Sequence, residues 1–146
     1  LGARDALRLE AGLCLYGQDL SKDVTPVEAS LTWVISKRRR EEGNFPGFKI
    51  INEQLVNGIK KCRVGISPFG KAPARAGCEI FVNGGRKIGS ITSGGYSPTL
   101  ERPIAMGYVE EAFSKIGTEV LLSVRGKYLP AKIVNLPFVS PKYFRK

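Results

Sequence analysis

Two arginines near the start of the chain have the side-chain chemistry to bind an anion. Arg4 and Arg8 are four residues apart, so a helix would place both on one face. A guanidinium group presents two parallel donors to a carboxylate, which makes a carboxylate clamp for an anionic ligand one interpretation of this pair. The other interpretation is a structural ion pair, for which Glu10 is close enough in the sequence. Burial statistics favour the structural pair.

A run of four basic residues, Lys37–Arg40, concentrates positive charge in one place. The run contains Lys37, Arg38, Arg39 and Arg40. It could attract phosphates or an acidic protein, and such attraction would be sensitive to salt. Two glutamates follow directly and neutralise part of this charge, as at a solvated helix end. The sequence leaves docking of an acidic partner and a solvated helix end as even alternatives, and it argues against recognition of bases.

Three cysteines and a C-terminal tyrosine complete the set of candidate side chains. Cys14, Cys62 and Cys78 are scattered and have no CxxC spacing, so small buried hydrophobes are the better interpretation. Cys62 lies between two basic residues, which makes it the thiol whose pKa could be lowered. Tyr143 follows a proline-flanked segment, where its ring either seals the core or lines a pocket.

The composition excludes several function classes. The chain has 146 residues, a formal net charge of +10 and no histidine. Without histidine there is no Ser-His-Asp or Cys-His catalytic arrangement and no His-ligated zinc site, and the cysteine spacing argues against any metal site. No stretch is long and apolar enough to span a bilayer, so we expect no membrane partner. The cysteine usage indicates a reducing compartment rather than secretion.

Helical signals dominate the first part of the chain. The segment up to Gly17 is typical of helical or mixed structure. Residues Thr25–Glu28 have the pattern of a capping box with proline at the first helical position, which predicts a short helix. The basic run would end that helix, because cations complement the negative end of the helix dipole. A further helix is predicted over Phe48–Val56, ending at Asn57 and Gly58.

Alternating apolar and polar residues after Lys61 predict six short strands. These are Arg63–Ile66, Glu79–Val82, Lys87–Thr92, Ile104–Tyr108, Glu119–Val124 and Tyr128–Val134. Hairpin turns are predicted at Asn83–Gly85 and Arg125–Lys127, and a strand-end turn at Gly94–Pro98. The expected fold class is α+β, mainly β. Residues 58–146 would form an antiparallel Greek-key-like barrel, preceded by a helical or mixed segment over residues 1–57.

A basic barrel could also bind nucleic acid. A nucleic-acid-binding module is therefore one class of function to weigh against an enzyme. The net charge and the strand count favour this alternative. Small barrels that bind nucleic acid use aromatic residues interleaved with lysine and arginine on a strand face. The strands of this chain show aliphatic alternation instead. We therefore do not expect a nucleic-acid partner.

The sequence resembles the C-terminal portion of the aminomethyltransferases, the T-proteins of the glycine cleavage system. The resemblance runs from end to end of the chain, with the motifs in the same order and spacing. It is carried by Leu1–Gly17, Thr25–Ala29, Trp33–Arg40, Arg63–Gly65, Ile88–Gly94, Ser97–Pro98, Ile104–Val109 and Pro137–Val139.

This resemblance implies an enzyme that takes the aminomethyl group from the lipoyl arm of the H-protein and delivers a one-carbon unit to tetrahydrofolate, with release of ammonia. Arg4 matches a substrate-binding arginine of the family, and Tyr143 matches a binding tyrosine. Where the family often has a second tyrosine, this chain has Phe144. The resemblance places the catalytic aspartate of the family in an N-terminal half outside this chain, so we expect no catalytic residue here and no activity from the chain alone.

The resemblance also implies partners and a compartment. Residues 1–57 would be the end of the folate-binding region, and the missing N-terminal half of the enzyme and the H-protein would be partners. The basic run Lys37–Arg40 is a possible docking site for the H-protein. The compartment would be the cytoplasm of a bacterium or the mitochondrial matrix of a eukaryote. Within the same superfamily, the folate-binding half of a sarcosine or dimethylglycine oxidising enzyme, or a folate-dependent tRNA-modification factor, is the alternative.

Overall fold

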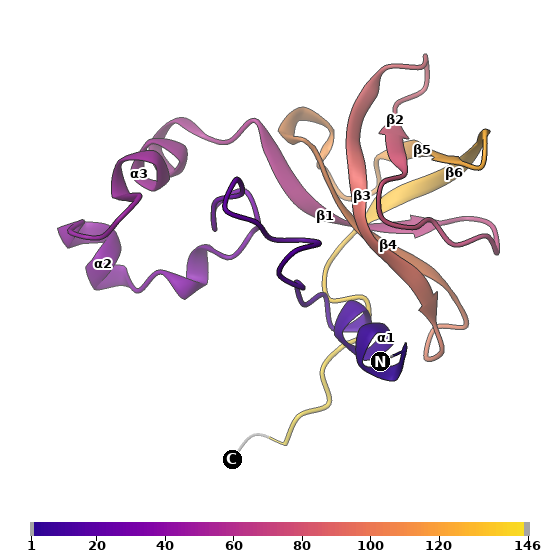
Figure 1. The fold of residues 1–146 in the computed structure, drawn as a ribbon, viewed down its shortest axis with the longest axis horizontal. Helices are drawn as coiled ribbons and strands as arrows, with labels where there is room; N and C mark the ends of the chain where they lie inside the picture. The colour runs from indigo at the N-terminus through magenta and orange to yellow at the C-terminus, as the bar shows by residue number, and fades with distance from the viewer. Residues whose placement is uncertain (1, 145–146) are drawn as a thin grey trace.

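Four short helical segments precede a sheet that fills the second half of the chain. The structure is a computed structural model that describes residues 2–144. Helix α1 (Gly2–Glu10) comes first, followed by the 3-10 turn η1 (Thr32–Val34) and by helices α2 (Lys37–Glu42) and α3 (Phe48–Asn57). Helix α3 ends at Gly58, which has a φ of 86° that suits glycine, as predicted. In Figure 1, α2 and α3 stand apart from the sheet, whereas α1 lies against it.

Six antiparallel strands form a closed barrel, which confirms the predicted fold class. They are β1 (Lys61–Pro68), β2 (Glu79–Phe81), β3 (Lys87–Ser97), β4 (Arg102–Glu110), β5 (Glu119–Val124) and β6 (Lys127–Val134), with the 3-10 turn η2 (Glu111–Phe113) after β4. The strand order around the barrel is β1-β4-β3-β2-β5-β6, and β1 closes it by pairing with β6. Strands β2, β3 and β4 follow one another and β1 lies beside β4, which is a Greek key.

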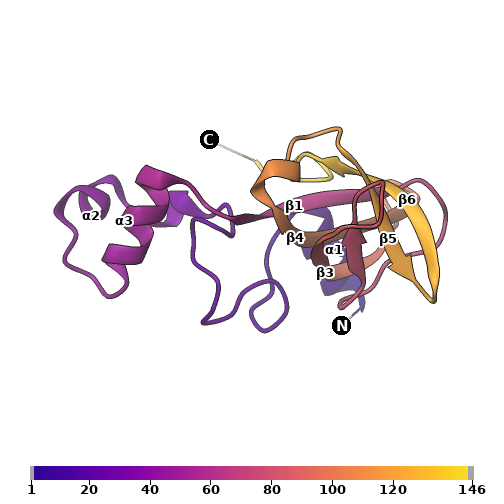
Figure 2. The ribbon, with the colours of Figure 1, turned by 90° about the horizontal axis from the view of Figure 1, so that it is seen from above.

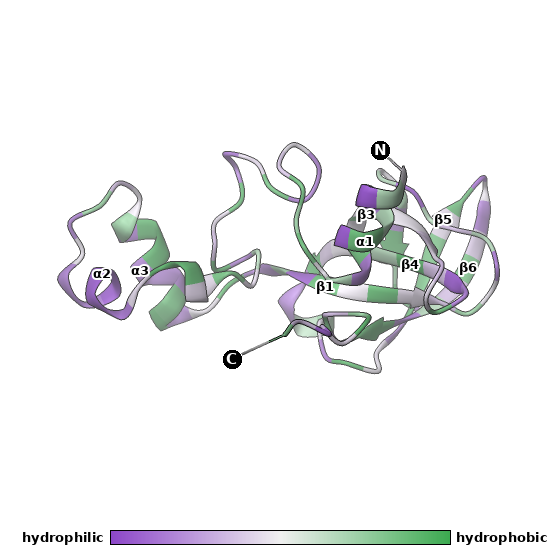
Figure 3. Cartoon of the chain, turned by 90° about the horizontal axis from the view of Figure 1, so that it is seen from below, coloured by the Kyte–Doolittle hydropathy of each residue, from purple (hydrophilic) through white to green (hydrophobic). Residues whose placement is uncertain are grey.

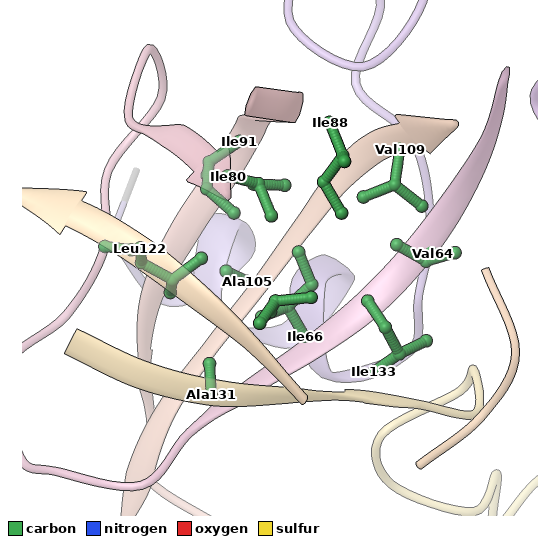
Figure 4. Close-up of a cluster of buried hydrophobic side chains, with 12 residues drawn as sticks. Val64, Ile66, Ile80, Ile88, Ile91, Ala105, Val109, Leu122, Ala131 and Ile133 are labelled. Carbon is green, nitrogen blue, oxygen red and sulfur yellow. The ribbon is translucent and has the colours of Figure 1, made fainter. Parts of the chain in front are cut away.

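Aliphatic side chains from all six strands fill the interior of the barrel (Figure 4). In each strand these are alternate residues, because successive side chains point to opposite faces of the sheet. The inward residues of β4 include Ala105 and Val109, both fully buried. The residues between them, Met106 and Tyr108, are also buried although they belong to the outer face. The outer face of β4 is therefore covered by another part of the chain.

The N-terminal segment provides that cover. Leu9 of α1 packs with Ile104 and Met106 in a second apolar cluster outside the barrel. Leu136 and Phe138, from the segment that follows β6, close this cluster. Figure 2 shows α1 beside β3 and β4. The first residues of the chain are thus part of the folded barrel unit and not a free arm.

The predicted helix at the capping box is shorter than expected. The box itself forms, because the backbone N–H of Glu28 donates to the Thr25 hydroxyl at 3.2 Å. The chain then makes only a turn, and Ser30 has a φ of 57°, a conformation that cannot continue a right-handed helix. We predicted that the basic run would end this helix, and the structure shows that it does not. It begins α2, with the Ser36 hydroxyl accepting from the N–H of Arg39.

The glycines at positions 94 and 95 do not form the predicted strand-end turn, because β3 continues through them to Ser97. Ala105 pairs with Gly94 on the neighbouring strand. A Cβ atom at Gly94 would overlap the backbone carbonyl of Ala74. Gly94 therefore allows a loop to approach the strand closely. A glycine that serves this purpose cannot be told from a turn glycine by turn propensity alone.

Candidate functional site

Arg4 lies on the exposed side of α1, at the mouth of a small hollow. The hollow has a volume of about 390 Å³ and is lined by Gly2, Arg4, Asp5, Arg8, Leu15 and Gln18. Arg4 makes no hydrogen bond or ion pair with any other residue that the structure describes. Its guanidinium is therefore available for an anionic ligand, in contrast to that of Arg8.

Arg8 has a structural role. Its guanidinium forms ion pairs with Asp19 at 2.6 Å and with Asp5 at 2.7 Å. It also donates to the Ser93 hydroxyl of β3 at 2.9 Å and to the side-chain oxygen of Gln18 at 3.2 Å. The structural alternative that we favoured for the arginine pair is correct for Arg8, but its partners are aspartates and not Glu10. Arg8 ties α1 to the barrel and so fixes the helix that carries Arg4.

Asp19 is the centre of this polar cluster, although no sequence pattern singled it out. Its side chain is fully buried and accepts hydrogen bonds from the Thr92 hydroxyl at 2.6 Å and the Ser93 hydroxyl at 2.9 Å. Its backbone carbonyl accepts from the hydroxyl of Tyr108 at 2.7 Å, and burial raises the pKa of that phenol well above its usual range. Because Thr92 is 73 residues away from Asp19, no local motif could reveal the contact.

Glu10, at the end of α1, makes a second set of hydrogen bonds between segments distant in the sequence. Its carboxylate accepts from the Ser97 hydroxyl at 2.6 Å, from the backbone N–H of Thr99 at 3.1 Å and from the Thr99 hydroxyl at 3.0 Å. The Ser97 hydrogen bond contributes most to lowering the pKa of Glu10 below its usual value of 4.5, against the opposing effect of burial. The backbone carbonyl of Glu10 accepts from the N–H of Val139. Glu10 therefore links α1, the β3–β4 turn and the C-terminal segment.

Tyr143 makes no described hydrogen bond with Arg4. It lies in the C-terminal segment beyond Val139, and 66% of its surface is exposed. Its hydroxyl makes no hydrogen bond with the described residues. The described residues show Tyr143 neither sealing the core nor lining a pocket. The role of Tyr143 therefore stays a prediction.

The basic run is exposed along α2, and half of its charge is balanced locally. Lys37 approaches Glu41 at 3.8 Å and Arg38 approaches Glu42 at 3.9 Å. Arg39 donates to the backbone carbonyl of Asn44 at 3.4 Å. Exposed pairs of this length contribute little stability, so the charges stay free to rearrange toward a partner.

The pKa of Cys62, which its basic neighbours in the sequence could lower, is raised instead. Burial is the largest influence on this thiol and raises its pKa above the usual 9.0, and the flanking basic residues do not reverse the effect. Burial also raises the pKa of Cys14. The cysteines are free thiols, and within residues 2–144 no cluster of metal-ligating side chains is present. No helix in this range is long and apolar enough to cross a membrane.

A buried arginine that sequence reasoning missed connects the N-terminal segment to β1. Arg63 is 8% exposed and donates to the backbone carbonyl of Ala29 at 2.8 Å and to that of Gly12 at 2.9 Å. It also contacts the sulfur of Met106 at 3.2 Å. The positive charge of Arg63 is thus held by carbonyl oxygens, and the contacts fix the loops that follow α1 and the capping box.

The sequence matches two families in succession. Residues 61–140 match the glycine cleavage T-protein C-terminal barrel domain, and residues 1–39 match the GCVT N-terminal domain. The mitochondrial aminomethyltransferase of Dictyostelium discoideum is 57% identical over 145 residues, which are 98% of this chain and 36% of the relative. The mitochondrial aminomethyltransferase of Pisum sativum is 51% identical, over 99% of this chain and 35% of the relative. The chain therefore spans about a third of the length of these relatives.

A solved structure has the same fold. The crystal structure of the glycine cleavage system aminomethyltransferase T from Bartonella henselae superposes with a TM-score of 0.94 at 48% sequence identity. The match covers 98% of this chain and 40% of that chain. The similarity thus includes the helical segment as well as the barrel.

Proposed function

The chain belongs to the family of glycine cleavage T-protein C-terminal barrel domains, and we propose that it works as the C-terminal part of an aminomethyltransferase. The reaction would transfer the one-carbon unit from the aminomethyl-lipoyl H-protein to tetrahydrofolate and release ammonia. Similarity over nearly the whole chain to proteins named aminomethyltransferase is the observation that carries this proposal. These relatives support this function and not the sarcosine-oxidising or tRNA-modifying alternatives.

Arg4 has the chemistry and the surroundings to hold the acidic end of a folate. Its guanidinium has no described protein partner, and it borders a hollow whose other arginine, Arg8, is already paired with two aspartates. A carboxylate is the natural partner for such a group, because the guanidinium can donate two parallel hydrogen bonds to it. We assign the binding of the tetrahydrofolate tail to Arg4, with Tyr143 as a second contact contributed by the C-terminal segment.

The H-protein is the proposed macromolecular partner, and the basic run on α2 is its proposed docking site. The run is exposed, and its ion pairs to Glu41 and Glu42 are weak enough to be exchanged for others. A positive surface would speed the approach of an acidic carrier protein more than it would tighten the final complex. The mitochondrial names of the relatives favour the mitochondrial matrix as the compartment.

The test uses a joined polypeptide, in which the upstream part of the Dictyostelium discoideum relative is fused to this chain. Substitution Arg4→Ala should raise the KM for tetrahydrofolate roughly 10- to 100-fold, as expected for the loss of a charge-assisted hydrogen bond. Arg102→Ala, at an exposed arginine at the start of β4, is the matched control and should leave the KM unchanged. An unchanged KM in Arg4→Ala would contradict the assignment of Arg4.

A further inference from the structure

Gln18 borders the same hollow as Arg4, from the loop that follows α1. Both residues belong to its lining, and the hollow has a volume of about 390 Å³. Figure 3 shows hydrophilic as well as hydrophobic residues along α1, whose polar side faces this hollow. Gln18 is exposed, although the side chain of its neighbour Asp19 is fully buried. The side chain of Gln18 is therefore within reach of a molecule that occupies the hollow.

The backbone at Gln18 is held in a tight turn. Its N–H donates to the backbone carbonyl of Leu15 at 3.2 Å, and the N–H of Gly17 donates to that of Leu20 at 2.8 Å. Gly17 has a φ of 93°, a left-handed conformation that suits glycine. The next residue, Asp19, is the buried centre of the polar cluster. The position of Gln18 is thus set before a ligand binds, which lowers the entropic cost of using it as a contact.

Arg8 determines which way the amide group of Gln18 faces. Nη2 of Arg8 donates to Oε1 of Gln18 at 3.2 Å, and the Ser93 hydroxyl lies 3.2 Å from the same oxygen. A guanidinium group has only donors, so it can face the amide oxygen but not the amide NH2 group. The NH2 group of Gln18 makes no hydrogen bond with any residue that the structure describes. Its two N–H donors are therefore available to a ligand.

The lining of the hollow favours a ligand group that only accepts hydrogen bonds. Arg4 contributes a guanidinium and Gln18 contributes an amide NH2 group, and both lack a described partner. Asp5 also lines the hollow, but its carboxylate is paired with Arg8 at 2.7 Å. A carboxylate accepts through two oxygens with about four lone-pair directions, so one carboxylate can satisfy Arg4 and Gln18 together.

We propose that Gln18 is a second binding residue of this hollow, and that its amide NH2 group and the Arg4 guanidinium hold one and the same carboxylate of the ligand. The proposal rests on the proposed function for the identity of that ligand, a folate with an acidic tail. Arg8 would support both contacts, because it ties α1 to the barrel and fixes the amide of Gln18.

The test measures binding to the joined polypeptide by isothermal titration calorimetry with two ligands. One is tetrahydrofolate and the other is its dimethyl ester, in which both tail carboxylates are blocked. Gln18→Met keeps the length of the side chain and removes the amide. It should weaken the binding of tetrahydrofolate about 3- to 10-fold, as expected for the loss of one hydrogen bond, and that of the ester less than about twofold. An equal loss for both ligands would overturn the proposal.

A second variant separates the donor role of Gln18 from its contact with Arg8. Gln18→Glu keeps an oxygen toward Arg8, loses the two donors and adds a negative charge, so it should weaken tetrahydrofolate binding at least about tenfold. Asn83→Asp makes the same change from amide to carboxylate at an exposed turn between β2 and β3, and it should leave binding unchanged. A loss in Gln18→Met without one in Gln18→Glu would overturn the proposal, because Gln18 would then act only through Arg8.

The double variant Arg4→Ala with Gln18→Met tests whether the two residues share one carboxylate. Without Arg4 the carboxylate is no longer fixed, so the double variant should bind at least about threefold better than the product of the two single losses predicts. Losses that multiply fully would overturn the shared carboxylate.

The two proposals can fail separately. A loss in Arg4→Ala without one in Gln18→Met overturns this inference alone. No effect of Arg4→Ala, or no binding of tetrahydrofolate by the unaltered joined polypeptide, contradicts the proposed function and this inference together.

Discussion

At the scale of single residues, the structure separates two arginines that look equivalent in the sequence. Arg4 and Arg8 share a helix, but Arg8 is held by Asp5 and Asp19 while Arg4 borders the hollow beside them. Helical spacing predicts that the two arginines share a face. It cannot say which one meets a carboxylate, because the decisive partner, Asp19, is placed by a loop and by hydrogen bonds from Thr92 and Ser93.

The buried carboxylate of Asp19 should matter more for stability than any exposed charge of the chain. Asp19→Ala removes the buried carboxylate that pairs with Arg8 and accepts from the Thr92 and Ser93 hydroxyls. Removing one partner of a buried pair costs about 3–5 kcal/mol. Urea unfolding of the chain, followed by circular dichroism, should show a decrease of this size. Asp23→Ala, at an exposed aspartate, should change the free energy of unfolding by less than about 0.5 kcal/mol. Equal effects of the two substitutions would contradict the role of Asp19.

Glu10 should give the stability a defined dependence on pH. The pKa of Glu10 is lowered in the folded chain, so its charged form stabilises the fold at pH values above its unfolded pKa of about 4.5. This contribution is lost as the pH falls through the lower, folded pKa. Glu10→Gln should therefore be less stable than the original chain by about 1–3 kcal/mol near pH 7, with the difference shrinking below pH 4.5. A difference that stays constant between pH 7 and pH 3, measured by urea unfolding, would contradict this.

At the scale of elements, the barrel strands were predictable and the helical segment was less so. Strands such as Glu119–Val124 have the same bounds in the prediction and in the structure, because their alternation is local and each inward residue faces the same core. The helix predicted after the capping box would have to continue past Ser30, whose left-handed conformation ends it. For the same reason the basic run begins α2 instead of ending the preceding helix.

The position of the basic run on an exposed helix gives the docking proposal a direct test. Replacing Lys37–Arg40 by four glutamates in the joined polypeptide should lower the association rate with the H-protein roughly tenfold or more at low salt, and less at high salt. The control for net charge replaces four exposed lysines after α3 by glutamate, Lys71, Lys115, Lys127 and Lys132. Stopped-flow fluorescence measures both. An unchanged rate at low salt would exclude the basic run as the docking site.

At the scale of the whole molecule, the chain combines a complete barrel with a helical segment that exposes apolar surface. The strands close around the barrel core, and α1 and the C-terminal segment cover the outer face of β4. The α2–α3 segment has no comparable cover. Under the proposed function, the net charge of +10 would serve an acidic carrier protein and an anionic folate tail. Under the proposed function, this chain would supply Arg4 and Tyr143 to the active site, and the catalytic aspartate that the resemblance places upstream would come from outside it.

The most direct test of this account is the turnover of aminomethylated H-protein with tetrahydrofolate by the isolated chain and by the joined polypeptide. We predict no methylene-tetrahydrofolate above the background from the isolated chain and measurable turnover from the joined polypeptide, because only the latter brings an upstream catalytic group to Arg4. Normal turnover by the isolated chain, or none by a joined polypeptide that melts cooperatively, would contradict the account.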